Sequence, residues 1–166
     1  HYPSAFMAAL MTSDWDDIDR LAIEITECKH MGIDVLPPDV NYSFHEFSVA
    51  DGDNRLGSIR FGLDAIKNVG KGAVEEILKA RQDGPFTSIN DFISRVSSRV
   101  VNRKTWESLI KTGGMDSFGE RGSLLNSLDM ILSLATKIQK ERSSSQIDLF
   151  GASDDPTVSL PDIQLI

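Results

Sequence analysis

The chain has 166 residues, of which 40% are apolar and 25% charged, a balance typical of a soluble globular domain with its own core. No apolar run approaches the ~20 residues that a helix needs to cross a bilayer, so no membrane partner is expected. The single cysteine, Cys28, excludes an internal disulfide and agrees with a reducing cytoplasm, the expected location. The sequence has neither a starting methionine nor a signal-peptide pattern, and we therefore expect a piece of a longer protein.

The net charge of −8 is unevenly distributed along the chain. Residues 1–54 hold 2 basic and 11 acidic side chains, and residues 112–166 hold 4 basic and 8 acidic ones. Residues 55–111 hold 11 basic and 6 acidic side chains and are therefore net positive, at +5. The chain as a whole does not attract a polyanion, but its middle third could, unless these charges only form a solvated face.

The first 43 residues are expected to form two helices and a short extended stretch. Pro3 can begin the first helix, and apolar spacing continues it through Met11. Residues 13–17 supply an N-cap for a second helix, which Gly32 ends as a C′ residue. Residues 33–36 are expected to be extended, because two prolines follow. The apolar face of the second helix is predicted to hold Ile18, Leu21, Ala22, Ile25 and Cys28.

Three aspartates in this part, Asp14, Asp16 and Asp17, superficially offer a D-x-D cluster for two Mg²⁺ ions. Their position at a helix N-terminus favours capping instead. The three histidines are scattered along the sequence, so no zinc site is expected. The sequence therefore nominates no catalytic and no metal-binding residue.

Beyond residue 43 the pattern predicts a β-hairpin followed by helices. Residues 44–49 and 58–63 can pair across the turn-rich residues 51–54. Helices are then predicted over residues 63–69, 73–81, 89–96 (capped by Ser88) and 101–112. A long amphipathic helix follows Gly122, with a buried stripe at Leu124, Leu128, Ile131, Ala135 and Ile138.

Residues 67–73 carry the most informative local pattern, because two predicted helices meet there in a hydrophobic-Gly-x-Gly turn. Glycines permit positive φ and leave no Cβ between the backbone and a bound group. The second helix starts with unpaired N–H groups at the positive end of its dipole, which suits an anion such as a DNA phosphate. The candidate contact residues are Lys67, Asn68, Val69, Gly70, Lys71, Gly72 and Ala73.

A plain structural turn would use the same glycines, so the surroundings of the turn matter. The flanking helices, the apolar Val69 and the basic middle third together favour phosphate binding, which positions a DNA backbone and reads no bases. The arrangement resembles a helix-hairpin-helix motif, and the helices at 89–96 and 101–112 would pack against it as a companion pair. That pair lacks a matching Gly-x-Gly, so phosphate contact is assigned to the first hairpin alone. Nearby Arg99, Arg103 and Lys104 either extend the patch or only face solvent.

Residues 143–166 are expected to form a flexible polar tail with too little apolar surface to fold alone. Just after a serine-rich leader, the tail presents Gln146, Ile147, Asp148, Leu149 and Phe150. The adjacent Leu149 and Phe150 could fill a pocket on a partner while Gln146 forms hydrogen bonds at its rim. The alternative is a terminal strand that folds back on the core.

Several short sequence segments, spread over nearly the whole chain, carry a resemblance to a known family. They are His1-Tyr2-Pro3, residues 6–10, Glu27-Cys28, residues 31–39, residues 59–63, Gly84-Pro85-Phe86 and residues 109–116. Together with the hairpin they resemble the C-family of bacterial replicative polymerases, the alpha subunits of DNA polymerase III. The resemblance implies four segments: the C-terminal part of the fingers (1–43), a β-hairpin plus helix-hairpin-helix DNA-binding region (44–118), a long packing helix (119–142) and a flexible tail with a sliding-clamp-binding motif (143–166).

The resemblance further implies that the parent protein is a DNA-directed DNA polymerase, a nucleotidyltransferase that uses Mg²⁺. The family's catalytic carboxylates lie in a palm domain upstream of anything present in this sequence. The chain itself is therefore expected to be non-catalytic and to need no cofactor. Its expected partners are double-stranded DNA, the sliding clamp (the beta subunit) and other replisome subunits.

Two other readings of the sequence stay open. The first is a helix-hairpin-helix module of a DNA repair protein, against which the fingers-like first forty residues argue. The second is a purely protein-interaction segment, in which the hairpin is only a turn and the acidic surface excludes DNA. On each reading the fold class is mainly α, with a small β-hairpin.

Overall fold

The computed structural model of the chain describes residues 2–51, 56–145 and 165. This part is mainly helical with a small sheet, as the sequence predicted. Its buried apolar side chains form two clusters, one built from residues 7–59 and one from residues 40–138. None of the described helices has the length and hydropathy that crossing a bilayer requires.

The first two helices, α1 (Pro3–Ser13) and α2 (Ile18–His30), follow the prediction closely. Pro3 stands in the first turn of α1, where a missing N–H costs nothing. Asp17 caps α2, because its carboxylate accepts the N–H of Arg20 at 3.1 Å, which confirms the capping interpretation for this aspartate. Gly32 ends α2 with φ +75°, a left-handed conformation that favours glycine.

The buried face of α2 differs from the predicted one. Leu21 and Cys28 are buried as expected, but Ile18 is 78% exposed and Ala22 is also exposed. Glu24 lies between Leu21 and Cys28 on the same stripe and is only 7% exposed. Ile25 also packs against the first core. Apolar periodicity cannot find a buried carboxyl group, so the prediction missed Glu24 and wrongly included Ile18 and Ala22. Burial raises the pKa of Glu24 above its ordinary value.

The sheet contains β1 (Asp34–Leu36), β2 (Ser48–Ala50) and β3 (Ser58–Arg60) in the order β1-β3-β2. β2 and β3 pair antiparallel, so the predicted hairpin is confirmed, although its strands are shorter than expected. β1 pairs with β3 in parallel, which the sequence did not predict because three residues are too few to show alternation. The sheet and the helical pair enclose the first core, whose buried members are Met7, Ala8, Met11, Leu21, Cys28, Ile33, Phe47 and Ile59.

Helical elements make up the rest of the described chain. They are η1 (Leu63–Ala65), α3 (Lys71–Ala80), η2 (Arg81–Asp83), α4 (Ile89–Arg95), α5 (Arg103–Thr112), η3 (Asp116–Phe118), α6 (Arg121–Asn126) and α7 (Leu128–Ser145). Ser88 caps α4, as predicted, by accepting the N–H of Asp91 at 3.1 Å. α5 begins two residues later than expected, because Asn102 serves as its N-cap.

Two predicted helices were wrong in extent. The helix expected over residues 63–69 is a single 3₁₀ turn, because Ile66 is extended and Asn68 takes φ +68°. The long helix expected after Gly122 is broken into α6 and α7 at Ser127, whose ψ is 0°. The predicted stripe through Leu124, Leu128, Ile131, Ala135 and Ile138 is nevertheless buried in full.

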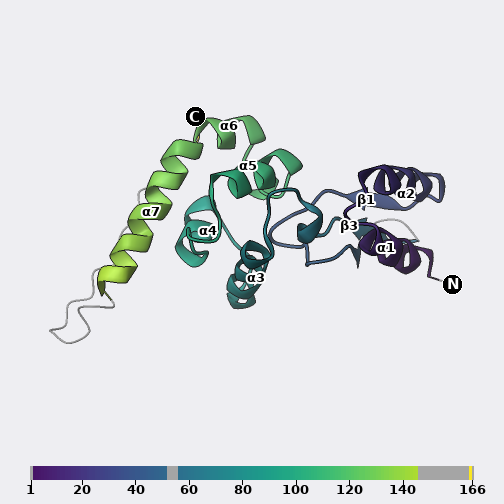
Figure 1. The fold of residues 1–166 in the computed structure, drawn as a ribbon, viewed down its shortest axis with the longest axis horizontal. Coiled ribbons are helices and arrows are strands. Elements are labelled where there is room, and N and C mark those ends of the chain that lie inside the picture. Colours follow the sequence, from purple (N-terminus) through teal and green to yellow (C-terminus); the bar gives the residue numbers. More distant parts are fainter. Residues whose placement is uncertain (1, 52–55, 146–164, 166) are drawn as a thin grey trace.

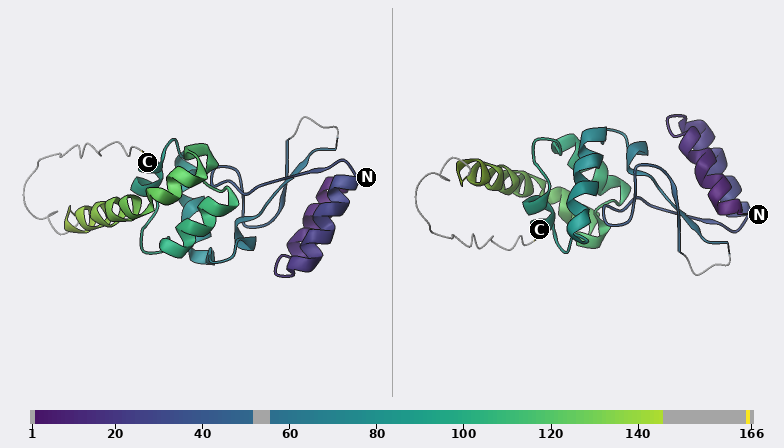
Figure 2. Two further views of the ribbon diagram at one scale, coloured as in Figure 1. Left: turned by 90° about the horizontal axis from the view of Figure 1, so that it is seen from above. Right: turned by 90° about the horizontal axis from the view of Figure 1, so that it is seen from below.

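The second core is organised around aromatic side chains. The rings of Phe92 and Trp106 meet edge to face at 5.2 Å between centroids, and Phe86 packs on Phe92 in the same way at 4.8 Å. α4 packs against α7, and α5 against α6. α7 lies at the opposite end of the molecule from α1 and α2, with α3, α4 and α5 between them (Figures 1 and 2).

Residues 39–45 run between the two cores and bind both. The N–H of Val40 donates to Gly114 O at 3.0 Å, and the hydroxyl of Ser43 donates to Phe61 O at 2.7 Å. The N–H of Leu63 donates to Phe44 O at 2.8 Å, which extends the strand pairing up to η1. Gly62 lies in this contact, where the two chain segments approach too closely for a side chain.

We predict that Gly62→Ala costs about 2–4 kcal/mol of unfolding free energy. A Cβ built on Gly62 would lie 2.6 Å from His45 O and from the backbone carbon of Glu46, and backbone atoms cannot move away cheaply. Gly72→Ala is the matched control, because its Cβ would meet nothing within 4 Å. Urea unfolding of both variants tests this, and equal stability of the two would contradict the close approach.

Candidate nucleic-acid interface

The turn between η1 and α3 has a different backbone from the one that the glycines suggested. The left-handed residue is Asn68, with φ +68°, and it is the one non-glycine residue with positive φ in the described chain. Gly70 has φ −73° and ψ 154°, ordinary extended values for an N-cap, and Gly72 already lies inside α3. The two glycines therefore do not use the positive φ that they permit, and the property that remains relevant is their lack of a side chain.

The first turn of α3 leaves backbone donors available. Gly70 O accepts the N–H groups of Ala73 and Val74 at 2.9 and 3.1 Å. For the N–H groups of Lys71 and Gly72, the described residues provide no acceptor, and no side chain caps the helix. A Cβ on Gly70 or Gly72 would meet nothing within 4 Å, so another molecule can approach this backbone closely. A helix N-terminus with these features is able to accept an anion.

Contacts from α5 hold the turn in place. The hydroxyl of Thr105 donates to Asn68 O at 3.0 Å, and the side-chain amide of Asn68 donates to the hydroxyl of Ser108 at 3.3 Å. Val69 and Ala73 are buried, so their side chains pack into the second core. The other five candidate residues are exposed, namely Lys67, Asn68, Gly70, Lys71 and Gly72.

The neighbouring cations are not equally available. The guanidinium group of Arg103 pairs with the carboxylate of Glu107 at 3.2 Å and with that of Asp129. The hydrogen bond to Asp129 raises the pKa of Arg103 above its ordinary value. Its charge is therefore already balanced within the chain. Arg99 and Lys104 are exposed, and neither has an ion-pair partner among the described residues.

A pocket of about 640 Å³ opens over the turn. Its lining includes residues 66–71 together with Trp15, Val100, Asn102 and Thr105. It also includes Asp64, whose carboxylate oxygens lie 3.1 and 3.2 Å from Nδ1 of His45. None of these five residues outside the turn was predicted from the sequence. Asn102 could have been found as an N-cap before the α5 pattern, whereas no sequence spacing links Trp15 to this pocket.

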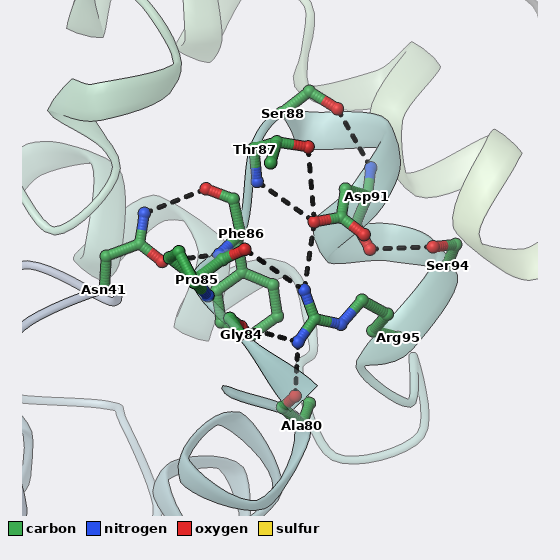
Figure 3. Close-up of polar contacts among 10 residues, drawn as sticks. All are labelled: Asn41, Ala80, Gly84, Pro85, Phe86, Thr87, Ser88, Asp91, Ser94 and Arg95. Carbon is green, nitrogen blue, oxygen red and sulfur yellow. Dashed lines mark hydrogen bonds and ion pairs between the residues drawn. The ribbon is translucent and has the colours of Figure 1, made fainter. Parts of the chain in front are cut away.

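The C-terminal end of α3 is fixed by Arg95 (Figure 3). Its guanidinium group donates to the carbonyl oxygens of Ala80, Gly84 (2.7 Å) and Pro85 (3.3 Å). It also pairs with the carboxylate of Asp91 one turn earlier on α4, at 3.0 Å. The connection between α3 and α4 is therefore held by one planar cation, which in turn fixes the direction in which α3 presents its N-terminus.

The remaining candidate residues give no site in the described chain. Gln146, Ile147, Asp148, Leu149 and Phe150 lie outside the described residues. Among the residues that are described, no cluster of three or more His, Cys, Asp or Glu side chains could hold a metal ion.

Comparison with known proteins gives the family. Residues 32–124 match the helix-hairpin-helix motif family, and since these residues make up more than half of the chain, the chain belongs to that family.

Three bacterial relatives are similar over nearly the whole chain. Each is a DNA polymerase III subunit alpha: that of Campylobacter jejuni is 43% identical over 93% of this chain, that of Thermus aquaticus 42% over 94%, and that of Mycobacterium tuberculosis 42% over 95%. The chain spans only 12–13% of the length of these relatives.

We predict that Arg95→Lys lowers the unfolding free energy by about 2–4 kcal/mol. Lysine keeps the charge but lacks the planar fork that reaches several carbonyl oxygens at once. Arg99→Lys is the matched control, because Arg99 is exposed and its side chain bonds no described residue. Thermal and urea unfolding measure both, and a loss as small for Arg95→Lys as for Arg99→Lys would contradict this role.

Proposed function

We propose that the chain is a non-catalytic segment of a bacterial replicative DNA polymerase that holds duplex DNA by its backbone, without sequence preference. The observation that carries the proposal is the open N-terminus of α3, where the N–H groups of Lys71 and Gly72 have no acceptor among the described residues and two exposed lysines, Lys67 and Lys71, stand close by in sequence. The family match over residues 32–124 and the polymerase relatives support it.

The turn acts on a phosphate by geometry and charge. Backbone N–H groups of α3 donate to phosphate oxygens, and the positive end of the helix dipole favours the anion. Lys67 and Lys71 add two mobile positive charges at its rim. Contacts of this kind fix the register of the protein on DNA and carry no base specificity. The expected affinity is that of non-specific binding, about 10⁻⁴–10⁻⁶ M at physiological salt.

The catalytic step belongs elsewhere in the longer polymerase. We propose that residues 1–43 belong to the fingers and residues 44–118 to the DNA-binding region. Residues 119–142, which include α6 and most of α7, would form a packing segment. Asp17 caps α2, and the carboxylate of Asp14 binds Arg20 at 3.0 Å, so both are engaged in structural roles. Carboxylates elsewhere in the parent protein would bind Mg²⁺. The parent protein would work in the bacterial cytoplasm. The chain alone is expected to incorporate no nucleotides.

We propose that residues 143–166 bind a second partner, the sliding clamp. Gln146, Leu149 and Phe150 have the form of a short peptide that docks on the sliding clamp, with two apolar side chains for a pocket. Docking would tether the polymerase to a ring around DNA and raise processivity through effective concentration. Other replisome subunits would join through the parent polymerase.

Lys71→Glu should weaken binding of a labelled blunt duplex at low salt, because it places a negative charge beside the phosphate. The magnitude of the slope of log K against log salt concentration should decrease by about one for each phosphate contact that is lost. Lys79→Glu is the matched control, because it makes the same charge change on α3 but in the last turn. Gly72→Leu should also weaken binding, since the added side chain projects into the approach path.

Equal weakening by Lys71→Glu and Lys79→Glu would show that only net charge matters. Unchanged binding by Lys71→Glu and by Gly72→Leu would reduce the hairpin to a structural turn. Either result removes the turn from the proposed function.

A peptide covering residues 143–152 should bind a bacterial sliding clamp with roughly micromolar affinity, since burying Leu and Phe side chains contributes about 3–6 kcal/mol before ordering costs. The control peptide carries Leu149→Ala and Phe150→Ala. Calorimetric titration compares the two. The clamp has no place in the function if both peptides bind equally, or if the first does not bind at high micromolar concentration.

A further inference from the structure

Trp15 is an exposed aromatic residue that the proposed function has not used. It lies in the connection between α1 and α2, and 50% of its surface is exposed. The other tryptophan, Trp106, is 2% exposed inside the second core. Trp15 also lies outside residues 32–124, which the helix-hairpin-helix family covers. An exposed indole gains free energy when a partner covers it, and tryptophan is the side chain most enriched at such contacts.

The position of Trp15 relates it to the turn. Its side chain lines the same pocket as Lys67, Asn68, Gly70 and Lys71, although more than fifty residues separate them in sequence. It also lines a smaller pocket of about 180 Å³ formed with Thr12, His45 and Asp64, among others. Trp15 therefore borders the anion site from the side of the first core.

The backbone around Trp15 is held before any ligand arrives. The two carboxylate oxygens of Asp14 accept hydrogen bonds from one guanidinium nitrogen of Arg20, at 3.0 and 3.1 Å. The N–H of Asp17 donates to Asp14 O at 2.9 Å, and the N–H of Asp14 donates to Leu10 O at 3.1 Å. A short connection fixed on both sides of Trp15 reduces the entropy that a contact through it would cost.

We infer that Trp15 packs against deoxyribose carbons of the same DNA strand whose phosphate occupies the α3 turn. The inference rests on the proposed function and adds a second, apolar contact from outside the hairpin. Sugar carbons are the apolar surface that flanks each phosphate of a duplex, whose bases are covered by stacking and pairing. Val100, 38% exposed in the lining of this pocket, adds apolar surface beside it.

The test uses the whole chain and a short blunt-ended duplex carrying a fluorescent label at one end. Trp15→Ala should weaken binding about tenfold, close to 1.4 kcal/mol, because the apolar area that the indole would bury against the sugars is lost. The slope of log K against log salt should not change, because no charge is lost. Trp15→Phe should be intermediate. Ile18→Ala is the control, since Ile18 is 78% exposed nearby but does not line the pocket.

Intrinsic fluorescence gives an independent readout on unlabelled duplex. Binding should change the emission of the Trp106→Phe variant, whose signal comes from Trp15, and should leave that of Trp15→Phe nearly constant. Thermal unfolding of each variant confirms that it is folded.

The outcomes separate this inference from the proposed function. If Trp15→Ala binds duplex like wild type while Lys71→Glu binds weakly, Trp15 makes no contact and the proposed function stands. If Trp15→Ala weakens the binding of single strands but not of duplex, sugar packing is wrong and base stacking replaces it. If wild type does not bind duplex at low salt, both proposals fail.

Discussion

The guanidinium group of Arg95 links the end of α3 to the start of α4, and the geometry of the candidate interface depends on that link. One planar cation satisfies carbonyl oxygens of Ala80, Gly84 and Pro85 and stacks over the ring of Phe86 at 4.6 Å. Burying these carbonyl oxygens without a donor would cost free energy.

Much of the fold was predictable where local chemistry is strong. Asp17, Ser88 and Gly32 mark helix boundaries by capping or by left-handed backbone, and the structure uses each in that way. The predictions failed where tertiary contacts outweigh the local sequence pattern. Glu24 is buried although it is charged, and the 3₁₀ turn at residues 63–65 stops early because the chain must reach the left-handed Asn68.

The position of the turn was predictable from the sequence, but its geometry only in part. The Gly-x-Gly pattern located the turn, yet the glycines at 70 and 72 lack positive φ and matter by leaving space above the helix. Arg103 was expected either to extend the basic patch or to face solvent, but the structure pairs it with Asp129, a contact across 26 positions that no local pattern reveals. For the same reason Trp15 could not be placed beside the turn from sequence.

The central claim is that the first turn of α3 receives a DNA phosphate through its backbone. Titration of the isotopically labelled chain with short blunt duplex, followed by amide chemical shifts in NMR spectra, tests this most directly. The account predicts the largest shifts at the N–H groups of Gly70, Lys71 and Gly72, fading as salt is raised. Binding that leaves these amides unshifted while others move would contradict it.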